Sequence, residues 1–125
     1  MNFDGESSPR KKDRAHANFY IVLENNSIET GTKELAPDST NNYAEYFGLI
    51  YGLERALELG VTVISIRGDS QLIVNQVTGR YRVKKDTLQV LHKMVHELLS
   101  RFESWSIEWI PREENTDADG LSRKM

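Results

Sequence analysis

The sequence predicts a single α/β domain in which helices flank a mixed sheet of about five strands. Three strand-like segments follow one another at the front of the chain, which favours antiparallel pairing. Later strand-like segments alternate with helical ones, and such units favour parallel pairing. A chain of 125 residues, 38% of them hydrophobic, has the length and the core material of one domain over residues 1–125.

The front of the chain is predicted to form three strands over residues 1–6, 17–24 and 27–35. The second of these is rich in β-branched and aromatic residues, which suit a pleated, half-buried surface. Asn25 and Asn26 indicate a tight turn between the second and third strands. Residues 7–14 are polar and basic and are predicted to form a loop.

A long helix is predicted next, because the hydrophobic residues change to a helical period. The hydrophobic stripe consists of Tyr46, Phe47, Leu49, Ile50, Leu53 and Leu57. Ser39 or Thr40 suits the start of this helix as a capping residue, and Gly60 suits its end. Residues 61–66 are almost all β-branched and are predicted to form a buried strand.

The rest of the chain is predicted to add helices around one further strand. The expected elements are a helix over 70–77, a basic loop over 79–85, a helix capped by Asp86 that ends near Phe102, a strand over 105–110, a loop over 111–114 and a short helix over 115–124.

The composition excludes several classes of protein. Cys is absent, which rules out a disulfide scaffold, a cysteine zinc site and a thiol nucleophile. The longest apolar runs, such as residues 19–23, are too short to span a bilayer. No secretory signal opens the chain. We therefore expect no membrane partner and a cytoplasmic location.

The charges are segregated along the chain, although the net charge is only −3. Basic residues cluster within residues 10–14 and 80–85, and six acidic residues lie between Glu103 and Asp119. Such a chain can present a basic face to a nucleic acid beside an acidic cleft. The alternative explanation is that each basic cluster is a solvated loop.

Four carboxylates occupy unusual places in this pattern. Asp4 interrupts a predicted strand, Glu45 lies in the first turns of the long helix, Asp69 directly follows the most apolar strand and Asp119 opens the last helical segment. Ligand sites in open α/β sheets gather at the carboxyl ends of strands. Capping, helix-dipole and surface roles explain Glu45, Asp69 and Asp119 equally well, whereas capping does not explain Asp4.

A cluster of four carboxylates would be stabilised by divalent cations, because the charges repel one another and resist desolvation. Hard oxygen ligands without Cys suit Mg²⁺ or Mn²⁺. Two such ions at one site can activate water and stabilise a leaving oxygen in phosphodiester hydrolysis. Asp4, Glu45, Asp69 and Asp119 are therefore candidate ligands of two metal ions.

Four segments of the chain, in order and with suitable gaps, resemble the signature segments of type 1 ribonuclease H. They are FDG at 3–5, TNNYAEY at 40–46, GDSQL at 68–72, and PREEN at 111–115 with ADGL at 118–121. The resemblance covers nearly the whole chain and implies an RNase H-like fold. It also implies that Asp4, Glu45, Asp69 and Asp119 are the catalytic, metal-binding acids.

The resemblance further implies cleavage of the RNA strand of RNA/DNA hybrids to 5′-phosphate and 3′-hydroxyl ends. Asn42 and Gln71 match family positions that touch the RNA minor groove, where the 2′-hydroxyls lie. Thr40 matches a position near a phosphate of the DNA strand. Helix capping is an alternative role for both Thr40 and Asn42. The partner expected is an RNA/DNA hybrid, and the chain is expected to be a monomer.

This sequence departs from the family pattern at two places. The Gly-rich stretch usual after the first Asp is replaced by residues 7–12, whose basic residues suit phosphate contacts instead. No His lies shortly before Asp119, where many members have one.

Three other hypotheses remain at the level of the sequence. One is a non-catalytic nucleic-acid-binding module on the same fold, although a naked acidic cluster would oppose phosphate binding. Another is the RNase H domain of a retroelement polyprotein. The third, a phospho-acceptor receiver domain, would need strictly alternating strands and helices, which the three front strands do not provide.

Overall fold

A computed structural model describes residues 1–8, 14–35 and 40–115 of the chain. Its elements, in chain order, are β1 (Asn2–Ser8), β2 (Arg14–Val22), β3 (Ile28–Leu35), α1 (Asn41–Glu58), β4 (Val63–Gly68), α2 (Gln71–Val77), α3 (Asp86–Leu99), β5 (Ser104–Trp109) and the 3₁₀ helix η1 (Arg112–Glu114). None of the described helices combines the length and hydropathy needed to cross a membrane.

The five strands form one mixed sheet in the order β3-β2-β1-β4-β5. The front strands pair antiparallel, β1 with β2 and β2 with β3. The later pairs, β1 with β4 and β4 with β5, are parallel. The predicted fold class, a mixed five-stranded sheet with an antiparallel front and parallel later strands, is confirmed.

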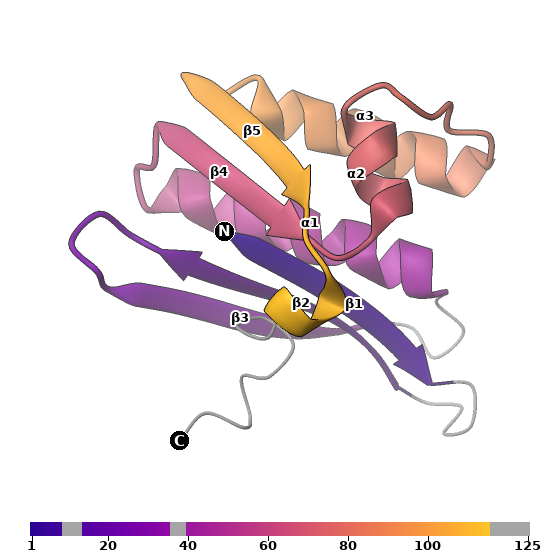
Figure 1. Ribbon diagram of the computed structural model, residues 1–125, viewed down its shortest axis with the longest axis horizontal. Coiled ribbons are helices and arrows are strands. Elements are labelled where there is room, and N and C mark those ends of the chain that lie inside the picture. Colours follow the sequence, from indigo (N-terminus) through magenta and orange to yellow (C-terminus); the bar gives the residue numbers. More distant parts are fainter. Residues whose placement is uncertain (9–13, 36–39, 116–125) are drawn as a thin grey trace.

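The helices that carry most of the core lie on one face of this sheet. In Figure 1, α1 and α3 lie behind the strands, and η1 lies in front of them near β1. The stripe predicted for α1 supplies the fully buried Tyr46, Leu49, Ile50 and Leu53. These side chains form a core with apolar residues from β1, β2, β4 and α3.

The ends of α1 follow the predicted chemistry. Thr40 is its N-cap, because the Thr40 side chain accepts a hydrogen bond from the Tyr43 amide at 3.2 Å. Beyond the other end, Gly60 adopts φ +82°, a left-handed conformation that Gly tolerates best. Ser70 caps α2 in the same way, through the Ile73 amide.

Three expectations about the later elements need correction, and a fourth falls mostly on residues outside the described part of the chain. The N-cap of α3 is Lys85 rather than Asp86, which lies in the first turn, where its charge favours the helix dipole. That helix ends at Leu99, before Phe102. Residues 112–114 form η1 instead of a loop. A helix was predicted over 115–124, but its first residue, Asn115, is not helical. Residues 116–124 lie outside the described residues.

Candidate active site

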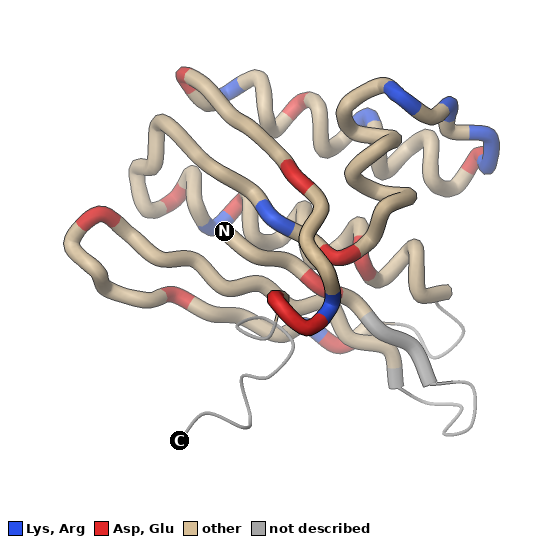
Figure 2. Tube along the Cα trace, in the orientation of Figure 1, with Lys and Arg blue, Asp and Glu red and all other residues tan. Residues whose placement is uncertain are grey.

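Three of the four predicted acids meet at one place in the sheet. Asp4 lies on β1, Glu45 in α1 and Asp69 directly after β4. One carboxylate oxygen from each lies within 4.8 Å of the others. Figure 2 shows acidic positions gathered where β1, α1 and the end of β4 approach one another. Asp119 lies outside the described residues.

Strand register brings Asp4 and Asp69 together. The parallel pairing of β1 with β4 places Phe3 beside Gly68, so the residues that follow them, Asp4 and Asp69, are neighbours across the strands. Asp69 is also held by its backbone, because its carbonyl oxygen accepts a hydrogen bond from the Trp109 indole at 3.1 Å. Trp109 comes from β5, so three segments fix this corner of the sheet.

A close approach between α1 and β1 brings in Glu45. A Cβ atom on Gly5 would lie only 2.2 Å from the Ala44 carbonyl carbon and from the Glu45 amide nitrogen. A Cβ atom on Gly48 would lie 2.3 Å from the Asp4 carbonyl oxygen. The helix can therefore lie directly on the strand only because both positions lack a side chain.

The site is electrostatically strained without a cation. The pKa of Glu45 is raised to about 7, because burial and, to a smaller extent, the neighbouring charge of Asp69 outweigh a hydrogen bond from Ser70 and the positive charge of Arg112. Asp4 is only 7% exposed. Three close, partly buried carboxylates with hard oxygen donors fit a divalent cation such as Mg²⁺ or Mn²⁺.

The segment that leads toward Asp119 is anchored to the strand that carries Asp4. Asn115 is completely buried. Its side-chain amide donates to the Phe3 carbonyl at 3.1 Å, and its side-chain oxygen accepts from the Asn2 amide group at 2.8 Å. The chain therefore leaves the described region right beside β1, four residues before Asp119.

The predicted substrate-binding residues border this site. Thr40 caps α1, and Asn42 lies half-buried in its first turn. Asn42 and Glu45 are three residues apart and are thus neighbours on the helix surface. Gln71 is the exposed first residue of α2, two positions after Asp69.

Sequence reasoning missed three positioning residues: Gly5, Trp109 and Asn115. Gly5 gives a visible signal, since a glycine directly after a strand carboxylate indicates a close backbone approach. Trp109 gives none, because it acts on a backbone carbonyl far away in the sequence. Asn115 ends the PREEN segment of the family resemblance, but its contact with the Phe3 carbonyl is not visible in the sequence.

The chain matches a model of the family described as "Reverse transcriptase-like" over residues 2–125. It is 39% identical over 119 residues to the "Bifunctional protein Rv2228c" of Mycobacterium tuberculosis, covering 95% of this chain and 33% of that protein. It is 42% identical over 122 residues to the "Ribonuclease HI" of Halobacterium salinarum, covering 98% of this chain and 61% of that protein. The chain thus spans about a third of the length of its mycobacterial relative.

Solved structures agree with the sequence relatives. The crystal structure of RNase H1 from Halobacterium salinarum superposes with a TM-score of 0.87 at 36% identity, covering 96% of this chain and 90% of that chain. LC11-RNase H1 in complex with RNA/DNA hybrid superposes with a TM-score of 0.83 at 29% identity, again covering 96% and 90% of the two chains.

Proposed function

Because the chain belongs to the reverse transcriptase-like, RNase H-like family, we propose that it hydrolyses the RNA strand of RNA/DNA hybrids. The products are 5′-phosphate and 3′-hydroxyl ends. The observation that carries the proposal is the meeting of Asp4, Glu45 and Asp69 within 4.8 Å at the carboxyl end of β4. The relative named Ribonuclease HI and the neighbour bound to a hybrid support it.

Asp4, Glu45 and Asp69, with Asp119 as a fourth ligand, would hold two Mg²⁺ or Mn²⁺ ions. Bound there, such ions supply Lewis-acid assistance to water attack and neutralise charge on the leaving oxygen. The chain's own contribution is to fix the ligands in advance. The Trp109 indole holds the backbone of Asp69, and Ser70 holds the carboxylate of Glu45.

Specificity for RNA requires contacts to the 2′-hydroxyl in the wide minor groove of an A-like helix. Asn42 and Gln71, at the start of α1 and of α2, supply short polar side chains beside the acidic cluster. Thr40 completes this rim toward the phosphates of the DNA strand. The basic loop over 79–85 lies at the other end of α2, where Figure 2 shows several basic positions, and it suits longer-range phosphate contacts.

The proposal also covers the oligomeric state of the protein and its location in the cell. We expect the chain to act as a monomer, since the three described acids come from β1, α1 and the end of β4 of one chain and need no second copy. It acts in the cytoplasm, where hybrid substrates are accessible to a protein without disulfides.

A cleavage assay tests the activity directly. The purified chain is incubated with Mg²⁺ and an end-labelled RNA/DNA hybrid, single-stranded RNA of the same sequence, or double-stranded DNA. We expect cuts only in the RNA of the hybrid. Asp69→Asn should lower the turnover by about a hundredfold or more while the fold persists. Asp86→Asn is the matched control, because Asp86 is exposed in the first turn of α3.

Two results would refute the proposal. Equal cleavage of single-stranded RNA or double-stranded DNA would refute the substrate specificity. Hybrid binding without any metal-dependent cleavage would identify the chain as a non-catalytic binding module on the same fold.

A further inference from the structure

Trp109 places an exposed aromatic ring beside the acidic cluster. It is the last residue of β5, and the register of β4 with β5 pairs it with Gly68, the residue before Asp69. Trp109 is 42% exposed. Among the exposed large hydrophobic residues in the described part of the chain, it is the one that forms a hydrogen bond with a member of the cluster.

The ring of Trp109 is held in place at two points. The indole N–H donates to the Asp69 carbonyl at 3.1 Å, and the Ile110 amide donates to the Gly68 carbonyl at 3.0 Å. The indole nitrogen is the only polar atom of a Trp side chain, so the exposed remainder of the ring is apolar. A ring that is fixed in advance loses little conformational freedom when it meets a ligand.

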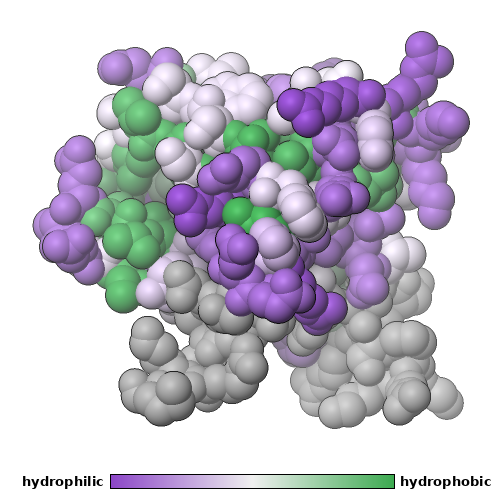
Figure 3. Space-filling model, viewed as in Figure 1, coloured by the Kyte–Doolittle hydropathy of each residue, from purple (hydrophilic) through white to green (hydrophobic). Residues whose placement is uncertain are grey.

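The surface around this ring is otherwise polar. Gln71 and Arg112 are both exposed, and Arg112 is near enough to Glu45 to affect its carboxylate. Figure 3 shows strongly hydrophilic surface around η1 and paler surface over β5. A fixed apolar ring at the rim of a hydrophilic site suits a ligand that presents carbon atoms there, because burial of apolar surface favours binding.

Trp105 shows the ordinary surroundings of an exposed Trp on the same strand. It is 36% exposed and packs edge-on against His96, with ring centroids 6.0 Å apart. It lies four residues before Trp109, about 13 Å away along the strand, where β5 pairs with the amino end of β4. Trp105 is therefore a matched control for any role that Trp109 owes to the acids.

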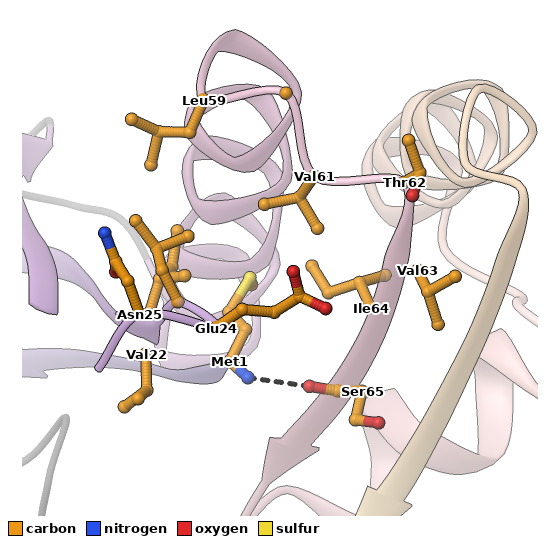
Figure 4. Close-up of a pocket in the computed structure, with 13 residues that line it drawn as sticks. Met1, Val22, Glu24, Asn25, Leu59, Val61, Thr62, Val63, Ile64 and Ser65 are labelled. Atoms are coloured by element: carbon orange, nitrogen blue, oxygen red, sulfur yellow. Dashed lines mark hydrogen bonds between the residues drawn. The ribbon is translucent and has the colours of Figure 1, made fainter. Parts of the chain in front are cut away.

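The cavity at the amino end of β4 does not provide an alternative contact for a ligand of the acids. Met1, Val63 and Ser65 are among the residues that line it, and Figure 4 shows the Glu24 side chain extending into it. The cavity lies at the end of β4 opposite to Asp69. A ligand bound at the acids therefore meets Trp109 and not this cavity.

An RNA/DNA hybrid presents sugar carbons to a side chain at this position. Its bases are paired and stacked inside the helix, so a flat side chain outside reaches the sugars and the edges of the bases across the shallow minor groove. The 2′-hydroxyls suit the amides of Asn42 and Gln71. The carbon-bound hydrogens of the ribose suit the negative face of an aromatic ring.

We propose that Trp109 packs the exposed face of its indole against the ribose that adjoins the scissile phosphate of the RNA strand. The inference rests on the proposed function and adds a substrate-binding residue to it. The ring orients the sugar so that the phosphate lies over the acidic cluster. Because the same indole bonds the Asp69 carbonyl, Trp109 links the position of the RNA strand to the position of a metal-binding acid.

Tryptophan fluorescence tests the contact, because the chain contains two Trp residues. The background is Asp69→Asn, which slows cleavage and keeps the carbonyl that Trp109 bonds. In this background, Trp105→Phe leaves Trp109 as the reporter, and Trp109→Phe leaves Trp105. Acrylamide quenching of Trp109 should be largely lost when the hybrid is bound, whereas quenching of Trp105 should be unchanged. Anisotropy of a labelled hybrid records binding independently.

Two substitutions separate the contact with the ribose from the hold on Asp69. Trp109→Phe and Trp109→Leu both remove the hydrogen bond to Asp69, so turnover should fall alike in both. Phe keeps a flat aromatic face and Leu does not. In the Asp69→Asn background, we expect a hybrid Kd close to that of the parent for Trp109→Phe and about tenfold higher for Trp109→Leu. Trp105→Leu should leave the Kd unchanged, and circular dichroism verifies each fold.

Three outcomes would overturn the proposal and leave the proposed function intact. The first is bound hybrid that does not change the quenching of Trp109. The second is equal protection of Trp105 and Trp109. The third is equal weakening of hybrid binding by Trp109→Phe and Trp109→Leu. A folded chain that neither binds nor cleaves the hybrid would refute the proposed function, and this inference with it.

Discussion

Glu45 has a carboxylate whose surroundings oppose its charge. It lies half-buried between α1 and the end of β4, and the charge of Asp69 is close to it. Burial is the larger cause of the rise of its pKa to about 7. A cation at this position would reverse the effect, because it would stabilise all three carboxylates in their charged forms.

In metal-free protein, this carboxylate should make the fold less stable as the pH rises. The unfolded chain releases the proton of Glu45 near pH 4.5, whereas the folded chain retains it to about pH 7. The folded state therefore binds more protons between these values, and the free energy of unfolding falls by up to about 3 kcal/mol as the pH rises through this window.

Urea denaturation in EDTA at several pH values between 4.5 and 7.5 measures this effect. The reference is Glu45→Gln, which cannot ionise and should not show this decline. The stability difference between the two proteins should change steadily in favour of the Gln variant toward neutral pH. Parallel stability curves would show that the surroundings of Glu45 do not disfavour its charge.

The role of some site residues could be predicted from the sequence, and the role of others could not. Asp4 could be predicted as a site residue, because no capping role explains an acid inside a strand. The family resemblance supported Glu45 and Asp69 as site residues. The contacts of Trp109 and Asn115 could not be predicted, because their partners are the carbonyls of Asp69 and Phe3. Only the folded chain brings such distant groups into contact.

At the scale of the elements, the contact between α1 and β1 determines the geometry of the site. Helix and strand touch through Gly5 and Gly48, whose missing side chains leave room for the backbone of Ala44 and of Asp4. This contact sets the position of Glu45 relative to Asp4.

Gly5→Ala should separate α1 from β1. The new methyl group would overlap the backbone of Ala44 and Glu45, so we expect a loss of about 1 to 3 kcal/mol in the free energy of unfolding. We also expect a smaller rise of the melting temperature on addition of Mg²⁺, because Glu45 moves away from the other ligands. Differential scanning fluorimetry with and without Mg²⁺ measures both.

The control for this variant is Gly60→Ala, which strains a backbone at φ +82° in open space far from the acids. It should lower stability and leave the response to Mg²⁺ intact. If both variants keep the wild-type response, the approach of α1 to β1 has no part in holding the metal.

Asn115→Ala tests the anchor of the segment before Asp119. The change leaves the Phe3 carbonyl and the Asn2 side chain without this partner, so stability should fall by about 1 to 3 kcal/mol. Hybrid cleavage should fall as well, measured at a temperature where the variant is folded. Asn2→Ala removes only one of the two bonds and should have a smaller effect on both. Full activity of folded Asn115→Ala would contradict the anchoring role.

Local signals in the sequence predicted the elements well and their contacts poorly. The change from strand to helix period located α1, and Thr40 and Gly60 marked its ends. The start of α3 was misassigned by one residue, because Asp86 suits both a cap and a first turn. The 3₁₀ helix after Pro111 was missed, because three residues contain no period.

At the scale of the whole molecule, the sheet separates two regions with opposite character. The carboxyl end of β4 carries the acidic cluster, and its amino end carries Val63, whose side chain is 58% exposed. Parallel pairing around β4 places strand ends of the same kind together, which is why distant acids meet at one end. The topology therefore gives the candidate active site its location, and the side chains give it its chemistry.

A crystal soaked in Mn²⁺ tests the central claim most directly, because anomalous scattering locates the ions without any assay. The account predicts two Mn²⁺ sites about 4 Å apart, held by Asp4, Glu45 and Asp69 together with Asp119. Well-ordered crystals with no Mn²⁺ at these carboxylates, or with Asp119 directed away from the other three, would contradict it.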